Sequence, residues 1–322
     1  MSLDIRGLTV ELPTETGWVR PVNDVSFSLA EGETLGIVGE SGSGKTMLSL
    51  ALMGLEPPGA RRGGEAWLEM RDGERMNLVT AAREQLRKMR GRDIAMVFQE
   101  PMTALDPVMR IGAQVEESIR VHEPSASASE VARRAIEALK RATVPEPERR
   151  ARQYPHQLSG GLRQRVMIAM ALAAGPRILI ADEPTTALDV TVQKQILELL
   201  AQLRRELQLS MLFITHDLGV VAQIADRTMV MYAGRIVEEG PTAEVLRHPR
   251  HPYTEGLLRA APRLERGKLT PIRGTVPALN ALPAGCSFGP RCDVHVSECD
   301  SAVPALVKVG AGEHLARCIL AR

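Results

Sequence analysis

Residues 39–46 read Gly-Glu-Ser-Gly-Ser-Gly-Lys-Thr and follow an apolar stretch, residues 33–38, that is typical of a buried strand. Successive backbone N–H groups in such a turn, together with the N-terminus of the following helix, can hold a triphosphate. Lys45 would contact the β and γ phosphates, and Thr46 would offer its hydroxyl to Mg²⁺. An ordinary glycine turn is the alternative, because chance matches arise on the order of once per hundred chains. The predicted phosphate-binding loop comprises Gly39, Glu40, Ser41, Gly42, Ser43, Gly44, Lys45 and Thr46.

A second apolar stretch, residues 178–181, ends in the adjacent acids Asp182 and Glu183. Ligands of open α/β sheets bind at the carboxyl ends of the strands, so both carboxylates would face a bound nucleotide. Asp182 would hold Mg²⁺ through water, and Glu183 would orient or deprotonate the water that attacks the γ phosphate. The alternative is a solvated turn or helix cap, which is the commoner role of an acidic strand end taken alone.

Two polar side chains follow two further strand-like stretches. Gln99 comes after residues 94–98, and His216 comes after residues 211–215. Strand ends of one parallel sheet meet at one edge, so both side chains would lie near the same nucleotide. A lone histidine in this position is usually structural, and His216 is a candidate only together with the other motifs.

Residues 158–165 read Leu-Ser-Gly-Gly-Leu-Arg-Gln-Arg and open an apolar helix. Its N-terminus could receive an anion through Ser159, Gly160 and Gly161. The chain therefore contains two separate phosphate-binding candidates.

The hydrophobic pattern predicts the elements that position these motifs. Alternation over residues 3–12 and 22–29 is typical of strands and predicts an antiparallel subdomain beside the nucleotide core. A helix is predicted over residues 191–208, and Ala233-Gly234 predicts a hairpin between two later strands.

Helical periodicity replaces this pattern between residues 101 and 157. Residues 125–129 and 145–147 interrupt it as loops or caps. The expected buried faces consist of Ile111, Val115 and Ile119, and of Val131, Ile136 and Leu139.

Taken in order, these motifs resemble the nucleotide-binding subunit of an ATP-binding cassette (ABC) transporter. The resemblance covers roughly residues 1–245 and includes the loop at 187–189, which contains Asp189. Residues 98–103 and 251–254, read with the phosphate-binding loop, are similar to the oligopeptide, dipeptide and nickel importer branch. The implied fold is an α/β P-loop NTPase cassette, in which a mixed sheet core is joined by an antiparallel β subdomain and a helical subdomain.

The resemblance also implies a domain division. Residues 1–245 would form the nucleotide-binding domain, with the helical subdomain at about 100–157. Residues 246–322 would form a small cysteine-containing C-terminal extension of the peptide-importer type.

Roles for individual residues follow from the same resemblance. Glu183, His216 and Gln99 would be catalytic, and ATP and Mg²⁺ would be the cofactors. Mg²⁺ would be held by Thr46, Gln99 and Asp182. In the family, two cassettes pair head to tail, so Ser159, Gly160 and Gly161 would contact nucleotide across that interface. Asp189 would also be a nucleotide-binding residue.

The implied partners are a second cassette, identical or paralogous, two transmembrane permease subunits and, indirectly, an external solute-binding protein. The chain would then act as a peripheral ATPase on the cytoplasmic face of the bacterial inner membrane and power the import of peptides or related small solutes. No nucleic-acid partner is expected.

The adenine contact is the least defined part of the predicted site. The family places an aromatic residue upstream of the phosphate-binding loop, and this position falls on Val19, next to Trp18. Trp18 could stack on the base after a one-residue shift. The alternative is that Trp18 is a surface aromatic and apolar contacts hold the base.

Four cysteines lie close to the C-terminus: Cys286, Cys292, Cys299 and Cys318. In a reducing cytosol, four thiolates could ligate a metal, and their wide spacing favours a [4Fe-4S] cluster over structural zinc. Unligated buried cysteines are the alternative. His251, His295 and His314 are expected at the surface rather than as ligands.

Composition excludes several other classes of protein. The chain has 322 residues, with 40 Lys plus Arg against 39 Asp plus Glu, so no overall basic field points to nucleic acid. Aromatic residues make up only 3%, too few for a base-stacking platform. No secretion signal is expected at the charged N-terminus, and no apolar run reaches the length of a membrane-spanning helix.

Two rival functions stay open at this point. A soluble cassette ATPase acting on DNA or ribosomes would carry a long coiled coil or two cassettes, and neither is visible in the sequence. A nucleotide-sensing or redox-sensing regulator would not need the complete hydrolytic set.

Overall fold

The computed structural model describes residues 2–15, 17–186, 188–260, 271–310 and 312–321, and over these residues the strands form two sheets. The smaller sheet is antiparallel, in the order β2-β1-β4-β5. It confirms the antiparallel subdomain predicted from alternation at the N-terminus. Its strands are β1 (Leu3–Thr14), β2 (Gly17–Leu29), β4 (Arg61–Glu69) and β5 (Arg75–Asn77).

The larger sheet carries the strands that precede the candidate motifs. Its order is β11-β12-β10-β9-β3-β8-β7-β6, and β9, β3, β8, β7 and β6 run parallel. Every residue of β3, β6, β7 and β8 is buried, as expected for a parallel sheet covered on both faces. The parallel strands are β3 (Thr34–Val38), β6 (Ile94–Val97), β7 (Ile178–Asp182), β8 (Ser210–Thr215) and β9 (Arg227–Tyr232).

Strands of the other direction extend one edge of this sheet. β10 (Arg235–Pro241) pairs antiparallel with β9 through the predicted hairpin, whose residues Ala233 and Gly234 have φ angles of 46° and 82°. Positive φ at both central residues is the backbone that a two-residue hairpin requires. Beyond β10 lie β12 (Leu315–Ala316) and then β11 (Val307–Lys308), so the C-terminal extension is hydrogen-bonded to the core sheet.

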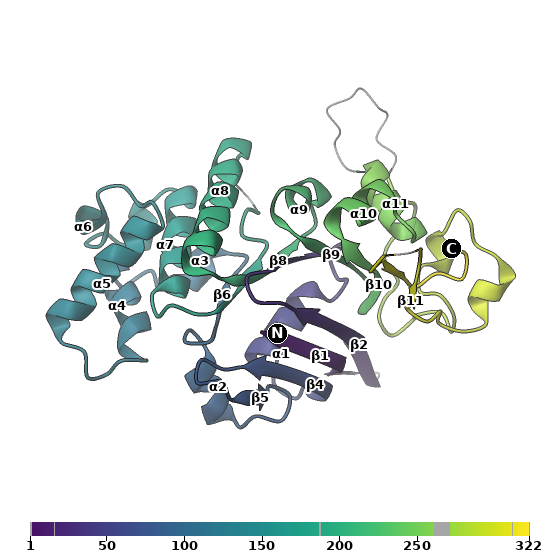
Figure 1. The fold of residues 1–322 in the computed structure, drawn as a ribbon, viewed down its shortest axis with the longest axis horizontal. Coiled ribbons are helices and arrows are strands. Elements are labelled where there is room, and N and C mark those ends of the chain that lie inside the picture. Colours follow the sequence, from purple (N-terminus) through teal and green to yellow (C-terminus); the bar gives the residue numbers. More distant parts are fainter. Residues whose placement is uncertain (1, 16, 187, 261–270, 311, 322) are drawn as a thin grey trace.

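Helices surround the larger sheet, with the C-terminal extension and the helical segment at opposite ends of the molecule (Figure 1). α8 confirms the helix predicted over residues 191–208. The helices outside the helical segment are α1 (Lys45–Met53), α2 (Arg83–Met89), α8 (Val190–Leu207), α9 (Leu218–Ile224), α10 (Thr242–Arg247) and α11 (Pro252–Ala260). Among the described helices, none combines the length and apolar character needed to cross a membrane.

The helical segment begins after β6 and packs around its own apolar cluster. Ile111, Val115 and Ile119 from one helix meet Val131 and Leu139 from the next, as predicted, while Ile136 is half-buried at the edge. The segment contains α3 (Pro101–Ala104), α4 (Ile111–Arg120), α5 (Ala128–Arg141), α6 (Pro147–Arg150), the short 3₁₀ helix Pro155–Gln157 and α7 (Gly160–Leu172).

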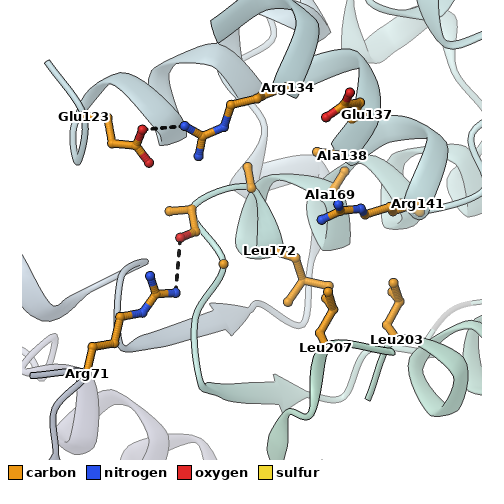
Figure 2. Close-up of a pocket in the computed structure, with 14 residues that line it drawn as sticks. Arg71, Glu123, Arg134, Glu137, Ala138, Arg141, Ala169, Leu172, Leu203 and Leu207 are labelled. Atoms are coloured by element: carbon orange, nitrogen blue, oxygen red, sulfur yellow. Dashed lines mark hydrogen bonds and ion pairs between the residues drawn. The ribbon is translucent and has the colours of Figure 1, made fainter. Parts of the chain in front are cut away.

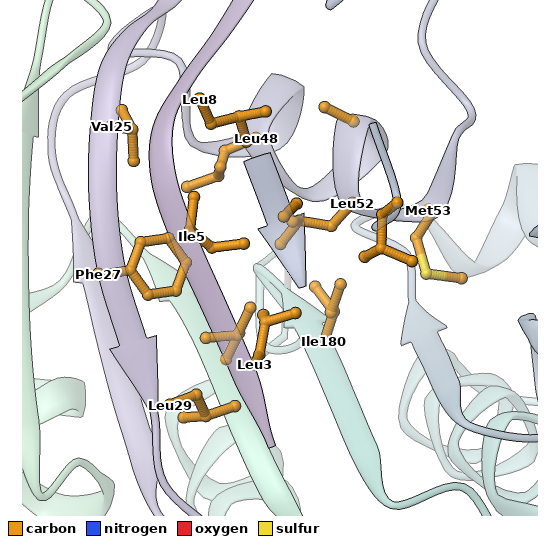
Figure 3. Close-up of a cluster of buried hydrophobic side chains, with 14 of the residues drawn as sticks. Leu3, Ile5, Leu8, Val25, Phe27, Leu29, Leu48, Leu52, Met53 and Ile180 are labelled. Carbon is orange, nitrogen blue, oxygen red and sulfur yellow. The ribbon is translucent and has the colours of Figure 1, made fainter. Parts of the chain in front are cut away.

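The main core lies between the two sheets and fixes the start of α1 (Figure 3). Leu48 and Leu52 of α1 are fully buried against Ile5 and Phe27 of the small sheet and Ile180 of β7. Burial of a Leu side chain contributes about 1.5–3 kcal/mol. The phosphate-binding loop therefore leads into a helix anchored on two sheets.

The extension contains two 3₁₀ turns, Gly289–Arg291 and Ser297–Asp300. The prediction that all three histidines lie at the surface is wrong for two of them, since His251 is 2% and His314 is 5% exposed. Hydrogen bonds explain their burial: His251 Nδ1 accepts the Tyr253 N–H at 3.1 Å, and His314 Nε2 lies 2.7 Å from Glu238 Oε1. His295 is exposed, as predicted.

Candidate nucleotide-binding and hydrolysis site

The phosphate-binding loop connects β3 to α1 and passes very close to other backbone. Gly44 is the N-cap of α1 with φ 104°, and a Cβ there would lie 2.0 Å from the Pro21 carbonyl oxygen. Only glycine tolerates both conditions. The Gly234 N–H donates to the Ser43 carbonyl at 2.9 Å, so the β9–β10 hairpin also supports the loop.

Lys45 lies inside this loop and is 5% exposed. Its ammonium group donates to the Gly39 carbonyl at 2.8 Å, to the Glu40 carbonyl at 2.9 Å and to Ser43 Oγ at 3.3 Å. Burial lowers the pKa of Lys45, while the charges of nearby carboxylates, Glu183 first, raise it. The side chain is thus held in the loop, where a phosphate oxygen would replace its weak carbonyl partners.

Asp182 and Thr46 form the candidate Mg²⁺ site. Asp182 is 1% exposed, and burial raises the pKa of its carboxyl to about 6, against a hydrogen bond with Thr46 that lowers it. Its Oδ1 atom is buried without a hydrogen-bond partner among the described residues. Buried carboxylate oxygens need a compensating partner, and oxygen ligands are those that Mg²⁺ prefers. The pair therefore fits Mg²⁺, which would neutralise phosphate charge when bound.

Glu183 is the point where three polar side chains meet. Thr186 Oγ1 donates to Glu183 Oε2 at 2.7 Å, Gln99 Nε2 donates to the same oxygen at 3.3 Å, and His216 Nδ1 lies 3.3 Å from it. The backbone of Glu183 has a φ of 46°, in the left-handed region that a non-glycine residue seldom adopts. This geometry brings together the three residues predicted as catalytic: Gln99, Glu183 and His216.

The helix-opening Ser-Gly-Gly motif stands at the start of α7, away from the phosphate-binding loop of the same chain (Figure 1). Ser159 caps α7 by accepting the Leu162 N–H at 3.4 Å, and its side chain is exposed together with Gly160. A Cβ on Gly161 would lie 2.7 Å from Val192 Cγ1 at the start of α8. Ser159 and Gly160 are therefore accessible from solvent, while Gly161 packs closely against α8.

Asp189 caps the neighbouring helix, α8. Its carboxylate accepts the Val192 N–H at 2.9 Å, and its backbone is extended. Of the predicted loop at 187–189, residue 187 lies outside the described residues.

Trp18 and Val19, the candidate adenine contacts, lie on β2 just before Pro21. Trp18 is 44% exposed, Val19 is half-buried, and the Arg61 guanidinium covers the Trp18 ring at 3.9 Å. The backbone of Arg20 and Pro21 lies against Gly44 and Gly234, which places this strand beside the phosphate-binding loop.

A cavity of about 260 Å³ lies elsewhere, between the helical segment and the core (Figure 2). An ion pair between Arg134 and Glu123 at 2.5 Å closes one side of it, and Arg71 reaches the Ala174 carbonyl at 3.5 Å. None of the predicted nucleotide-site residues lines it. This cavity therefore lies outside the candidate nucleotide site.

The four cysteines, Cys286, Cys292, Cys299 and Cys318, all line one small apolar cavity of about 10 Å³. Burial raises the pKa of the Cys286 and Cys292 thiols. Within the described part of the chain, no group of three or more His, Cys, Asp or Glu side chains is placed to hold a metal ion. The arrangement does not fit the predicted iron–sulfur cluster or zinc as it stands.

Sequence reasoning missed three residues that contact the site. Thr186 follows Glu183 by three positions, and a polar residue so soon after the acid was a usable signal. Tyr253 and Arg291 both hold Glu40 of the phosphate-binding loop, although they lie more than 200 positions away. No local pattern pairs such distant residues.

Family comparison agrees with this geometry. Residues 22–186 match the ABC transporter family, and residues 237–299 match the C-terminal region of oligopeptide/dipeptide transporters. The chain belongs to the ABC transporter family, and it is an ATPase.

The similar proteins within this family are peptide import ATP-binding proteins. The chain is 52% identical to a putative peptide import ATP-binding protein of Brucella melitensis, over 98% of this chain and 96% of that protein. It is 49% identical to another putative peptide import ATP-binding protein, of Brucella abortus, over 96% of this chain and 92% of that protein.

Solved structures share the cassette fold. One is the ATP-binding cassette MJ0796, a dimer in a post-hydrolysis state bound to ADP and Pi, with 31% identity and a TM-score of 0.65 over 74% of this chain and 98% of that chain. Another is cbiO1 from Clostridium perfringens, part of the ABC transporter complex cbiONQ, with 27% identity and a TM-score of 0.63 over 76% of this chain and 90% of that chain.

Proposed function

We propose that this ATPase powers the import of peptides or related small solutes through a membrane transporter. The observation that carries the proposal is the likeness to peptide import ATP-binding proteins along almost the whole chain, including the extension. The contacts of Gln99, Thr186 and His216 with Glu183 support an ATP-hydrolysing subunit. A DNA-acting or ribosome-acting ATPase and a nucleotide-sensing regulator are not favoured by these relatives.

The proposed working unit contains two cassettes, identical or paralogous, two permease subunits and, outside the membrane, a solute-binding protein. Exposure of Ser159 and Gly160 supports pairing, because these groups are available to a nucleotide on the opposite subunit. ATP bound between two cassettes would stabilise the closed pair, and its hydrolysis would release it. The chain would thus work at the cytoplasmic face of the bacterial inner membrane without crossing it.

An open apolar groove of about 380 Å³ supports contact with the permease. It lies between the core and α4, and Leu55, Phe98 and Val121 are exposed in it. Phe98 directly precedes Gln99, so a segment pressed into this groove would adjoin the residue that contacts Glu183. We propose that a cytoplasmic segment of the permease occupies the groove. Movement of Gln99 would then shift Phe98 and the permease segment that contacts it.

Replacing Val121 by Glu tests this assignment. We expect the variant to lose the permease when the tagged chain is captured from detergent-solubilised membranes and analysed by mass spectrometry, because a charge would be buried in an apolar contact. ATP binding by the purified subunit should be unchanged. Val307→Glu, on the exposed strand β11, is the matched control. Capture of ribosomal or DNA-associated proteins without a permease would refute the transport function itself.

For adenine, we propose that Trp18 stacks on the base and that Val19 contributes apolar contact. Stacking on an aromatic ring is worth about 1–3 kcal/mol per base, so Trp18→Ala should weaken ATP binding by roughly 5- to 150-fold. Trp18→Phe should restore most of it. Equal ATP affinity in Trp18→Ala and the unmodified protein would leave Trp18 as a surface residue under Arg61.

The convergence of the four cysteines on one cavity supports a separate proposal, that they bind an iron–sulfur cluster or zinc. Their thiols would have to move closer to do so, since the described side chains do not form a ligand group now. Anaerobic purification followed by iron, sulfide and zinc assays tests the proposal. Colourless, metal-free protein with full ATPase activity would contradict it.

For the domain organisation, we propose the division at residue 245, with a helical subdomain at about 100–157 and the extension over 246–322. The separate apolar cluster of the helical segment supports the first part. The turn-rich, cysteine-bearing structure after α11 supports the second.

A further inference from the structure

Two residues of the C-terminal extension hold a single residue of the phosphate-binding loop. Arg291 donates from both terminal nitrogens to the Glu40 carboxylate, Nη1 to Oε2 at 2.7 Å and Nη2 to Oε1 at 3.0 Å. The Tyr253 hydroxyl accepts the Glu40 N–H at 2.8 Å. Glu40 is therefore fixed at its side chain and at its backbone by the extension.

Arg291 is also held by contacts other than the pair with Glu40. Its side chain is 4% exposed, and its Nε donates to the Arg273 carbonyl at 2.9 Å. Its guanidinium lies 5.8 Å from the Tyr232 ring centroid and 5.9 Å from that of Phe288. A buried guanidinium held in this way can form a bidentate pair of defined geometry with a carboxylate. Little side-chain freedom of Arg291 is lost when that pair forms.

Glu40 passes this constraint to the residue that binds phosphate. Its carbonyl accepts from Lys45 Nζ at 2.9 Å and from the Ser43 N–H at 3.2 Å. The extension and Lys45 thus both contact Glu40. Displacement of Glu40 would disturb both the turn and the position of the ammonium group.

We infer that Arg291 is a positioning residue for ATP, and that the C-terminal extension pre-organises the phosphate-binding loop through the Arg291–Glu40 pair. A loop that is already ordered loses less conformational freedom when the triphosphate binds, so the pair increases ATP affinity without touching ATP. The competing explanation is that the pair only anchors the extension to the core.

Arg291→Met and Glu40→Gln separate the two explanations. Glu40→Gln leaves every other contact of Arg291 in place, and it removes the charge of its partner and one of the two acceptor oxygens. We expect each single variant to raise the Kd and KM for ATP about 10-fold, since a hydrogen bond to a charged group is worth that order. The kcat of Arg291→Met should stay within about 3-fold, because Arg291 lies outside the phosphate-binding loop and Glu183 and its contacts are unaffected. The double variant should be no weaker than the weaker single variant, because both lose one interaction.

Tyr232→Phe is the matched control. It removes a hydroxyl that accepts from Arg291 at 3.3 Å and leaves both bonds to Glu40 in place. It should bind ATP as the unmodified protein does. Unchanged ATP affinity in both single variants, with only a lower Tm for Arg291→Met, would overturn the inference in favour of simple anchoring. Should Arg291→Met fail to fold, Glu40→Gln alone decides between the two outcomes.

Discussion

Replacing Glu183 by Gln is expected to stop ATP turnover while leaving ATP bound. The carboxylate oxygen that contacts Gln99, Thr186 and His216 is the group available to take a proton from the attacking water. An amide keeps the shape but cannot accept that proton. General-base catalysis contributes about 10²- to 10⁴-fold, so kcat should fall by that factor. Single-turnover phosphate release and retained nucleotide are the two measurements.

Glu198→Gln on α8 is the control, since Glu198 is exposed and contacts only Lys194 among the described residues. It should hydrolyse ATP at the normal rate. The Glu183 variant should also accumulate as ATP-bound pairs of cassettes, which size-exclusion chromatography with light scattering would detect. Normal phosphate release by Glu183→Gln would remove Glu183 from its assigned role.

Lys45→Ala is expected to weaken ATP binding strongly. The ammonium group is the only described side-chain cation inside the phosphate-binding loop, and three loop oxygens already hold it there. Loss of hydrogen bonds from a charged donor to phosphate costs about 1.5–3 kcal/mol, so ATP affinity should fall roughly 10- to 150-fold. Equilibrium binding of ATP by calorimetry measures this directly.

Lys194→Ala is the matched control, because Lys194 is exposed on α8 and makes only the pair with Glu198 among the described residues. Thermal unfolding of Lys45→Ala must accompany the binding data, since the variant removes the Lys45 donor from the Gly39 and Glu40 carbonyls. A folded Lys45→Ala protein that binds ATP normally would contradict the assignment of this loop.

Most of the nucleotide site could be predicted because its residues stand at strand ends. β3, β8, β7 and β6 are adjacent parallel strands, so their carboxyl ends lie along one edge of the sheet. This edge carries the four predicted site residues Lys45, His216, Asp182 and Gln99. Apolar runs identified these strands, and periodicity identified α4, α5 and α8. Both kinds of element could be predicted because the pattern of apolar residues within each segment is enough to identify it.

The contacts of the extension could not be predicted in the same way. Nothing near Arg291 in the sequence indicates that its partner is Glu40, because the pair forms only when Tyr232, Tyr253 and Phe288 pack together. Burial of His251 and His314 has the same origin, because both contact Glu238 of β10. The His251 N–H donates to Glu238 Oε2 at 2.9 Å, and His314 Nε2 lies 2.7 Å from Glu238 Oε1.

ATP hydrolysis by this chain is proposed to power solute import, and peptide uptake by the native host measures this function most directly. Cells lacking the chain should be supplied with either the unmodified protein or Glu183→Gln at equal levels. Mass spectrometry of the medium then measures how fast the cells remove a mixture of short peptides. The unmodified protein should restore uptake, and Glu183→Gln should not. Peptide uptake that is the same with the chain, without it and with the variant would show that this chain does not power peptide import.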